Sequence, residues 1–152
     1  MVNEINLNII LRKHLESFDT IIRIVSIIFD PRSVIICLLC NLIVYRDIIF
    51  LKISTCLILN SFIIYCIKIY INRPRPYTTG MISNKDLFKI NDNMSFPSAH
   101  VANMYILAHI LIGTDSLILP LLMTIVRMYL GVHYISDCVG GYLIGKLICF
   151  LL

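Results

Sequence analysis

Charged and hydroxyl-bearing side chains in this sequence gather in three short clusters, separated by long apolar stretches. Arginine and lysine bind phosphate oxygens, a histidine can attack phosphorus or protonate a leaving oxygen, and a carboxylate can orient a histidine. Together the clusters have the inventory of a site that holds a phosphate and cleaves its ester. They are Lys68 with Arg75–Pro76, Pro97 to His100, and Arg127 with His133 and Asp137.

The first cluster lies where an apolar segment, residues 48–71, is expected to end. Lys68 falls about one turn before that end and Arg75 lies just beyond it, so both side chains can reach one anion. Taken alone, this pair is more simply explained as two cations that extend from a helix end towards water. Its meaning depends on the other clusters.

The second cluster, Pro97-Ser98-Ala99-His100, is typical of a helix start, with Pro97 near the first helical position. The backbone N–H groups of a first turn are unpaired, and the helix dipole favours an anion beside them. The Ser98 hydroxyl adds a donor, and His100 projects from the same turn. An ordinary helix start with an incidental histidine would look the same.

The third cluster pairs His133 and Asp137 at a spacing of four residues, with Arg127 shortly before them. Residues four apart share a helix face, so the carboxylate can hold one imidazole nitrogen as N–H and leave the other free to attack. The alternative is a structural ion pair between Arg127 and Asp137 beside an uninvolved histidine. Such groups are costly next to an apolar bundle unless they are used or paired.

The composition places the chain among membrane proteins. It is 152 residues long, 59% hydrophobic and only 14% charged, against about 25% charged residues in soluble domains. The net charge of +4 fits anion handling at a membrane, because nucleic-acid binding needs a basic, soluble and mostly polar face. We therefore expect the lipid bilayer as partner and no nucleic acid.

The elements that must position the clusters are helices. We expect an all-α integral membrane bundle of about six transmembrane helices in a single domain, 1–152, with an amphipathic interfacial segment over 1–17. Several of the helices are shorter than the ~20 residues of an isolated span, which suits a thin or locally deformed bilayer. The predicted helices cover 18–29, 33–45, 48–71, 97–113, 116–131 and 134–152.

If all six segments cross the membrane, the three clusters fall on one side of it. The third helix leaves where the fourth begins, and the fifth leaves on that same side, where the sixth begins. Each cluster lies at one of these ends. The topology therefore predicts one composite site at a membrane surface.

Taken in order, the clusters resemble the three-part signature of the type 2 phosphatidic acid phosphatase superfamily. That signature has Lys, six residues and Arg-Pro; then Pro-Ser-Gly-His; then Ser-Arg, five residues, His, three residues and Asp. Lys68 to Pro76, Pro97 to His100, and Val126 to Asp137 follow this order and spacing. Arg73-Pro74 does not fit the first part, because a lysine would be needed where Cys66 stands. The resemblance covers about residues 48–152.

The resemblance implies a six-helix core and a role for each site residue. By this resemblance, His133 is the nucleophile that forms a phosphohistidine, Asp137 orients it, and His100 donates a proton to the leaving oxygen. No metal or cofactor is implied, and the Cys37–Cys40 pair lies in an apolar run where we expect thiols rather than a metal or disulfide site. The phosphoryl oxygens would be held by Lys68, Arg75, Ser98, the backbone at Ala99, and Arg127.

The sequence departs from the signature at two positions. Ala99 replaces a glycine, which adds only a methyl group in a right-handed helix start. Val126 replaces a serine and removes one hydroxyl donor. Neither change deletes a reacting group, although the second alters the lining around the phosphate. In the polar stretch 77–96, Lys85 and Lys89 could cover a bound headgroup, or the stretch could be a simple connector.

The sequence thus predicts a metal-independent membrane phosphatase that acts on a lipid phosphate or diphosphate, such as an isoprenoid diphosphate or a glycerolipid phosphate. The resemblance implies a site on the outer or lumenal face. Three alternatives remain open: a lipid phosphotransferase with the same histidine chemistry, a catalytically silent membrane scaffold, and a vanadate haloperoxidase, for which this chain is too short and too apolar.

Overall fold

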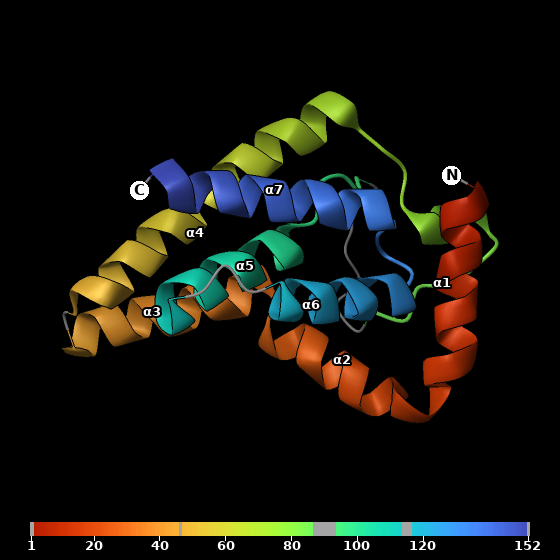
Figure 1. Cartoon of the computed structure of the whole chain (residues 1–152), viewed down its shortest axis with the longest axis horizontal. Helices are drawn as coiled ribbons and strands as arrows, with labels where there is room; N and C mark the ends of the chain where they lie inside the picture. Colours follow the sequence, from red (N-terminus) through yellow and green to blue (C-terminus); the bar gives the residue numbers. More distant parts are fainter. Residues whose placement is uncertain (1, 46, 87–93, 114–116, 152) are drawn as a thin grey trace.

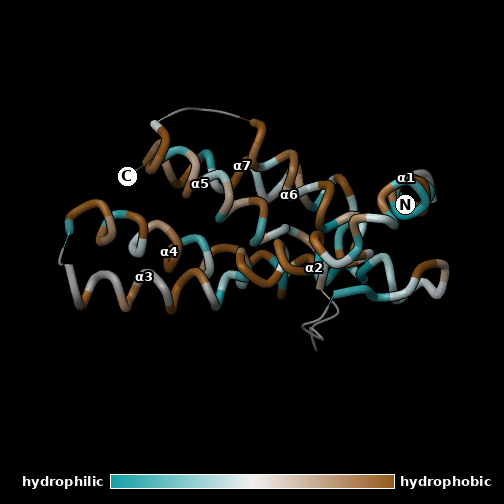
Figure 2. The backbone as a smooth tube through the Cα atoms, turned by 90° about the horizontal axis from the view of Figure 1, so that it is seen from below, coloured by the Kyte–Doolittle hydropathy of each residue, from teal (hydrophilic) through white to brown (hydrophobic). Residues whose placement is uncertain are grey.

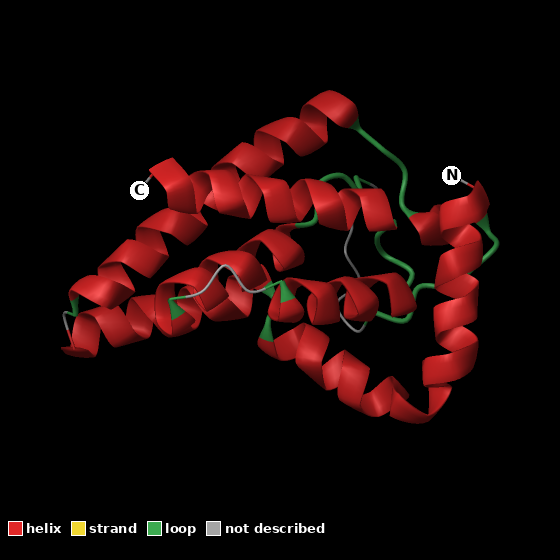
Figure 3. Cartoon of the chain, in the orientation of Figure 1, coloured by secondary structure: helices red, strands yellow, loops and turns green. Residues whose placement is uncertain are grey.

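The computed structural model describes residues 2–45, 47–86, 94–113 and 117–151. Within these ranges the chain is helical and has no strand, which confirms the predicted all-α class (Figure 3). Each of the six predicted apolar segments forms a helix, and one further helix precedes them. The elements are α1 (Val2–Leu15), η1 (Glu16–Phe18), α2 (Asp19–Ile28), α3 (Pro31–Tyr45), α4 (Ile48–Ile71), η2 (Pro76–Thr79), α5 (Ala99–Ile112), α6 (Ile118–Tyr129) and α7 (Ile135–Leu151).

Capping residues explain where α3, α4 and α5 begin and end. The Asp30 carboxylate accepts a bond from the Arg32 backbone N–H at 3.0 Å, at the start of α3. Asp47 caps α4 in the same way through the Ile49 N–H at 2.8 Å. At the other end of α4, Asn72 adopts the left-handed conformation with φ 45°, and Gly113 does so after α5 with φ 71°.

Helix α5 lies at the centre of the bundle, against α4, α6 and α7 (Figure 1). Its contact with α7 is close because Gly141 and Gly145 carry no side chain there. A Cβ at Gly145 would lie 2.8 Å from the Ala102 carbonyl oxygen, and one at Gly141 would collide with the carbonyl of Ser98. The two backbones therefore meet directly, which places the start of α5 beside the start of α7.

Helix α1 crosses the end of the molecule at which α6 ends and α7 begins (Figure 1). Its Asn8 side chain is buried and donates to the His133 carbonyl at 3.1 Å. Arg12 donates to the Tyr129 carbonyl at 2.8 Å and to the Leu130 carbonyl at 3.0 Å. Much of the segment predicted to lie in the membrane interface is thus also a helix that packs on the α6–α7 turn.

Apolar residues run along α4, α5, α6 and α7, whereas hydrophilic residues gather around α1 and the adjoining loops (Figure 2). Among the described residues, only α4 has both the length and the hydropathy of a membrane span. Helices α5 and α6 are apolar but have 14 and 12 residues, and about 14 residues rise only about 21 Å against a hydrocarbon core of about 30 Å. The helix positions are confirmed, but six membrane crossings are not.

Candidate active site

The three predicted clusters meet at one end of the bundle. The link between the first two is a short antiparallel bridge from Pro74 to Met94. Beside it, the Lys68 ammonium donates to the Met94 carbonyl at 2.6 Å, and the Arg75 guanidinium donates to the Val132 carbonyl at 3.0 Å. Each cation of the first cluster thus contacts the backbone that leads into one of the other clusters.

The second cluster begins α5 two residues later than predicted. Ser98 is the N-cap, with extended backbone angles of φ −82° and ψ 108°, and Ala99 is the first helical residue. Pro97 therefore lies outside the helix. The Ser98 N–H donates to the Asp137 carbonyl at 3.0 Å, which holds Ser98 against α7. The unpaired backbone N–H groups of the first turn, including that of Ala99, still lie at this end of the bundle.

The third cluster brings its histidine and carboxylate together. His133 is 2% exposed, and its Nδ1 lies 3.5 Å from Asp137 Oδ2. That same carboxylate oxygen accepts the Tyr134 backbone N–H at 2.8 Å, so it also caps the first turn of α7. A proton on Nδ1 can therefore face a fixed carboxylate, which leaves the other ring nitrogen as the nucleophilic atom.

The electrostatic surroundings keep the His133 imidazole neutral. Burial is the main reason that the pKa of His133 lies well below its ordinary 6.5, and the positive charges of Arg75 and Arg127 lower it further. A bond to the Ser95 backbone raises the pKa and only partly offsets these effects. The unprotonated form is the one that can attack phosphorus.

Arg127 does not pair with Asp137, so the alternative of a structural pair between them is wrong. Its guanidinium lies 3.0 Å from an oxygen of Asp86 and donates to the Ser26 hydroxyl at 2.6 Å. Arg127 and Asp86 are both buried. A buried arginine with an acidic partner from a loop is a site that another anion, such as a phosphate, could enter by exchange.

The partner of Asp137 is Arg73, which the signature had set aside. Its guanidinium donates to Asp137 Oδ1 at 2.6 Å and to the Glu4 carboxylate at 2.9 Å. It also stacks 4.2 Å from the centre of the Tyr134 ring. The two arginines of Arg73-Pro74-Arg75-Pro76 stand close together in the sequence. This indicates that both have partners, but the sequence does not identify those partners.

In the described part of the polar stretch, Asp86 rather than the predicted Lys85 reaches the site. The Lys85 ammonium lies 3.1 Å from the Tyr129 hydroxyl and 3.3 Å from Asp19, so it is held away from the phosphate-binding cations. Its tie to Tyr129 is the main cause of a raised Lys85 pKa. Asp86 contacts Arg127 instead, and Lys89 lies outside the described residues.

His100, the second residue of α5, has an acidic neighbour that sequence reasoning missed. Its Nε2 lies 3.9 Å from the Asp30 carboxylate and makes no hydrogen bond within the described residues. Arg127, His133, Arg75 and Lys68 are all close enough to interact with His100 electrostatically.

No three histidine, cysteine or acidic side chains in the described part of the chain gather as a metal site would require. The prediction for the Cys37–Cys40 pair lies partly outside that description, because the Cys37 side chain is not placed.

The sequence profile of the PAP2 superfamily matches residues 49–152. The chain belongs to the PAP2 superfamily. The resemblance drawn from the three motifs is therefore confirmed, and the matched range contains every predicted site residue. No curated protein and no solved structure is significantly similar to the chain. Membership indicates a phosphatase acting on phosphate esters, and membership together with α4 indicates association with a membrane.

Proposed function

We propose that the protein is a multi-pass membrane phosphatase that hydrolyses a lipid phosphate or diphosphate through a phosphohistidine. The observation that carries the proposal is the neutral, buried His133 beside Asp137, in the field of Lys68, Arg75 and Arg127. A neutral imidazole with an oriented proton is a nucleophile, and three cations around it compensate the charge of a phosphoryl group.

In the first step, the His133 nitrogen that does not face Asp137 attacks phosphorus. An N–P bond forms, the P–O bond to the lipid breaks, and the leaving oxygen takes a proton from His100. The Asp30 carboxylate, 3.9 Å from His100 Nε2, can orient the imidazole that donates this proton. Asp137 compensates the positive charge that develops on His133.

In the second step, water attacks the phosphohistidine. His100, now neutral, takes a proton from this water, the N–P bond breaks and inorganic phosphate leaves. Throughout, Arg75, Arg127 and Lys68 hold the equatorial oxygens, with the Ala99 N–H and the Ser98 hydroxyl as further donors. Charge stabilisation of this kind is the main contribution that proteins make to phosphoryl transfer.

A lipid substrate is supported by the apolar outer surface of the bundle. Large apolar side chains on the outer surface include Ile43, Phe62 and Phe150, at 78%, 66% and 85% exposure, and such a surface suits lipid rather than water. Isoprenoid diphosphates and glycerolipid phosphates both have a phosphate next to hydrocarbon. We further propose that the short helices cross a locally thinned bilayer and that the site opens on the outer or lumenal face.

The test is phosphate release by purified protein in detergent with EDTA, from a panel of lipid monophosphates and diphosphates. His133→Ala should abolish release, and His14→Ala, which removes an exposed histidine of α1, should leave it unchanged. Equal activity of His133→Ala and the wild type would refute the mechanism. Transfer of phosphate to a second lipid without free phosphate would instead establish the transferase alternative.

A further inference from the structure

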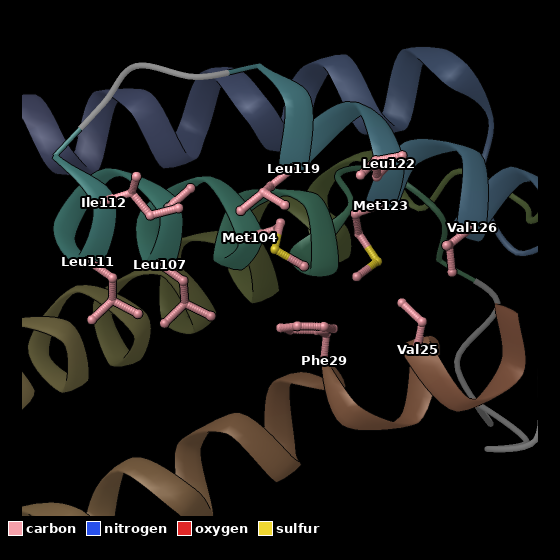
Figure 4. A pocket seen from close by; sticks show the side chains of 11 residues that line it. Val25, Phe29, Met104, Leu107, Leu111, Ile112, Leu119, Leu122, Met123 and Val126 are labelled. Carbon is pink, nitrogen blue, oxygen red and sulfur yellow. The ribbon is translucent and has the colours of Figure 1, made fainter. Parts of the chain in front are cut away.

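An apolar groove opens between α2, α5 and α6 (Figure 4). Its volume is about 280 Å³, and all eleven of its lining residues are apolar. Val25 and Phe29 of α2 face Met104 and Leu107 of α5 across the open space, and α6 closes one side (Figure 4). Neither the signature nor the mechanism uses this groove.

The groove adjoins the candidate active site along two helix faces. On α5, Met104, Leu107 and Leu111 follow His100 by four, seven and eleven residues, so they lie on the face that carries His100. On α6, Met123 and Leu119 precede Arg127 by four and eight residues and share its face. Both walls therefore begin at a residue of the phosphate site and run away from it.

Helix α2 forms the third wall, and this wall also lies beside the site. Val25 precedes Ser26, which accepts a hydrogen bond from Arg127. Phe29 precedes Asp30, the carboxylate beside His100. From Met104 to Leu111 the α5 wall covers seven residues of helix, a rise of about 10 Å. A molecule that fits it would be charged at one end and hydrocarbon along the remainder.

We propose that this groove binds one hydrocarbon chain of the substrate lipid while its phosphate lies at His133. This inference rests on the proposed function and adds the path of the tail. The volume of about 280 Å³ corresponds to about nine water molecules of about 30 Å³ each, which leaves room for a single narrow chain. Cations at one end of the groove and apolar walls beyond them match the two parts of such a lipid.

The chain offers a matched control in a second apolar recess, between α5, α6 and α7. Leu121 lines that recess, as Leu111 lines the groove. The two leucines are 57% and 59% exposed, so tryptophan can replace either one without overfilling the core. Leu107→Trp provides a second groove variant, placed about 6 Å closer to the site along α5.

The experiment measures kcat and KM for butyl, octyl, dodecyl and hexadecyl phosphate in detergent. Relative to wild type, Leu111→Trp should raise KM for the longest chain by about tenfold, the effect of displacing a methylene or two from an apolar pocket. It should leave butyl phosphate unchanged. Leu107→Trp should impose the same penalty at a shorter chain, and Leu121→Trp should not change the dependence on chain length.

The outcomes separate this inference from the proposed function. If both groove variants affect every chain length equally, or if Leu121→Trp shifts the chain-length dependence as much as they do, the groove is not the tail site. If the wild type hydrolyses none of the phosphates, or His133→Ala still hydrolyses butyl phosphate, the proposed function fails and this inference fails with it. A shift that follows the position of the tryptophan along α5 supports both.

Discussion

The region within the PAP2 match and the region before it contribute differently to the site. Residues 49–152 contain every group to which we assign a reaction step or a phosphate contact. Residues before the match add contacts that help to hold these groups in place. Glu4 contacts Arg73, Asn8 holds the His133 backbone, Ser26 contacts Arg127 and Asp30 approaches His100.

This division shows that the matched helices alone are not the complete site. The motifs determine which groups can react, and the preceding residues help to orient these groups. Substitutions in the two regions should therefore differ in kind. Matched residues should affect the reaction as a whole, and the preceding residues should affect single steps.

The largest effect is expected in the matched region, for Arg127→Ala. The loss of one donor to the transferring group lowers kcat by about a hundredfold to a thousandfold. It also leaves Asp86 buried without its partner, which costs about 3–5 kcal/mol of folding free energy. Phosphate-release kinetics and thermal unfolding in detergent measure the two losses. The double variant Arg127→Ala/Asp86→Asn should regain stability but not activity, and recovery of activity would contradict the role of Arg127.

Asp30→Asn tests the preceding region and should have a smaller, step-specific effect. Asparagine also caps helices well, so α3 should persist, but the negative charge beside His100 is lost. The rate should fall about tenfold for an alkyl phosphate, whose leaving oxygen needs a proton. An aryl phosphate with a good leaving group should be almost unaffected. An equal loss on both substrates would mean that Asp30 acts only through the fold.

Glu4→Gln should have a similar or weaker effect, because Glu4 acts on Asp137 only through Arg73. With the glutamate charge gone, Arg73 interacts more strongly with Asp137, and the pairing of Asp137 with His133 weakens. We expect kcat to fall by several-fold, up to about tenfold, with KM unchanged. A change in KM with kcat unchanged would contradict the proposed effect of Glu4 on Asp137 through Arg73.

Asp86→Asn should strengthen anion binding by a few-fold, because phosphate no longer competes with a carboxylate for Arg127. Inhibition by inorganic phosphate provides the measurement, and the rise in unfolding temperature on adding phosphate should be larger than in wild type. Asn84→Asp adds a charge nearby in the same loop and serves as the control. Unchanged inhibition by phosphate in Asp86→Asn would show that the anion does not displace this carboxylate.

The smallest effect concerns pH. Because the folded-state pKa of His133 is lowered from 6.5, above about pH 6.5 both the folded and the unfolded state hold this histidine neutral. Below that pH the unfolded state binds a proton that the folded state does not, so stability falls with acid by at most about 1.4 kcal/mol per pH unit. When thermal unfolding is measured between about pH 7.5 and about pH 5, the His133→Gln variant should lose less stability towards acid than the wild type. Equal slopes would contradict the lowered pKa.

Helix positions and motif residues could be predicted from the sequence because both depend on local signals. Pro31 and Gly113 mark helix ends through their backbone preferences and Asp47 through its side-chain cap. Asp137 lies in the first turn of α7 and reaches back to His133, just before that helix. Pro97 misled the prediction of the α5 start, since Ser98 has extended backbone angles and Ala99 is the first helical residue.

The partners of the site residues could not be predicted, because they come from distant parts of the chain. Arg73 and Asp137 are 64 residues apart, and no local pattern pairs them. Lys85 had the charge expected of a phosphate ligand, but the adjacent Asp86 reaches the site, which reflects the path of the backbone rather than residue type. The burial of Asn8 on α1 could not be predicted for a similar reason. Asn8 is a polar residue, and its burial depends on a bond to the His133 carbonyl, which is distant in the sequence.

The close contact of α5 with α7 has a consequence for how much the site can vary. Gly141 and Gly145 fix the separation of the anion-binding helix start from the nucleophile by having no side chain at all. Where two backbones touch, no side chain can change its rotamer to make room. A methyl group at either position would therefore have to move a whole helix. The tolerance of this enzyme to sequence change should accordingly be lowest at two residues that take no part in its chemistry.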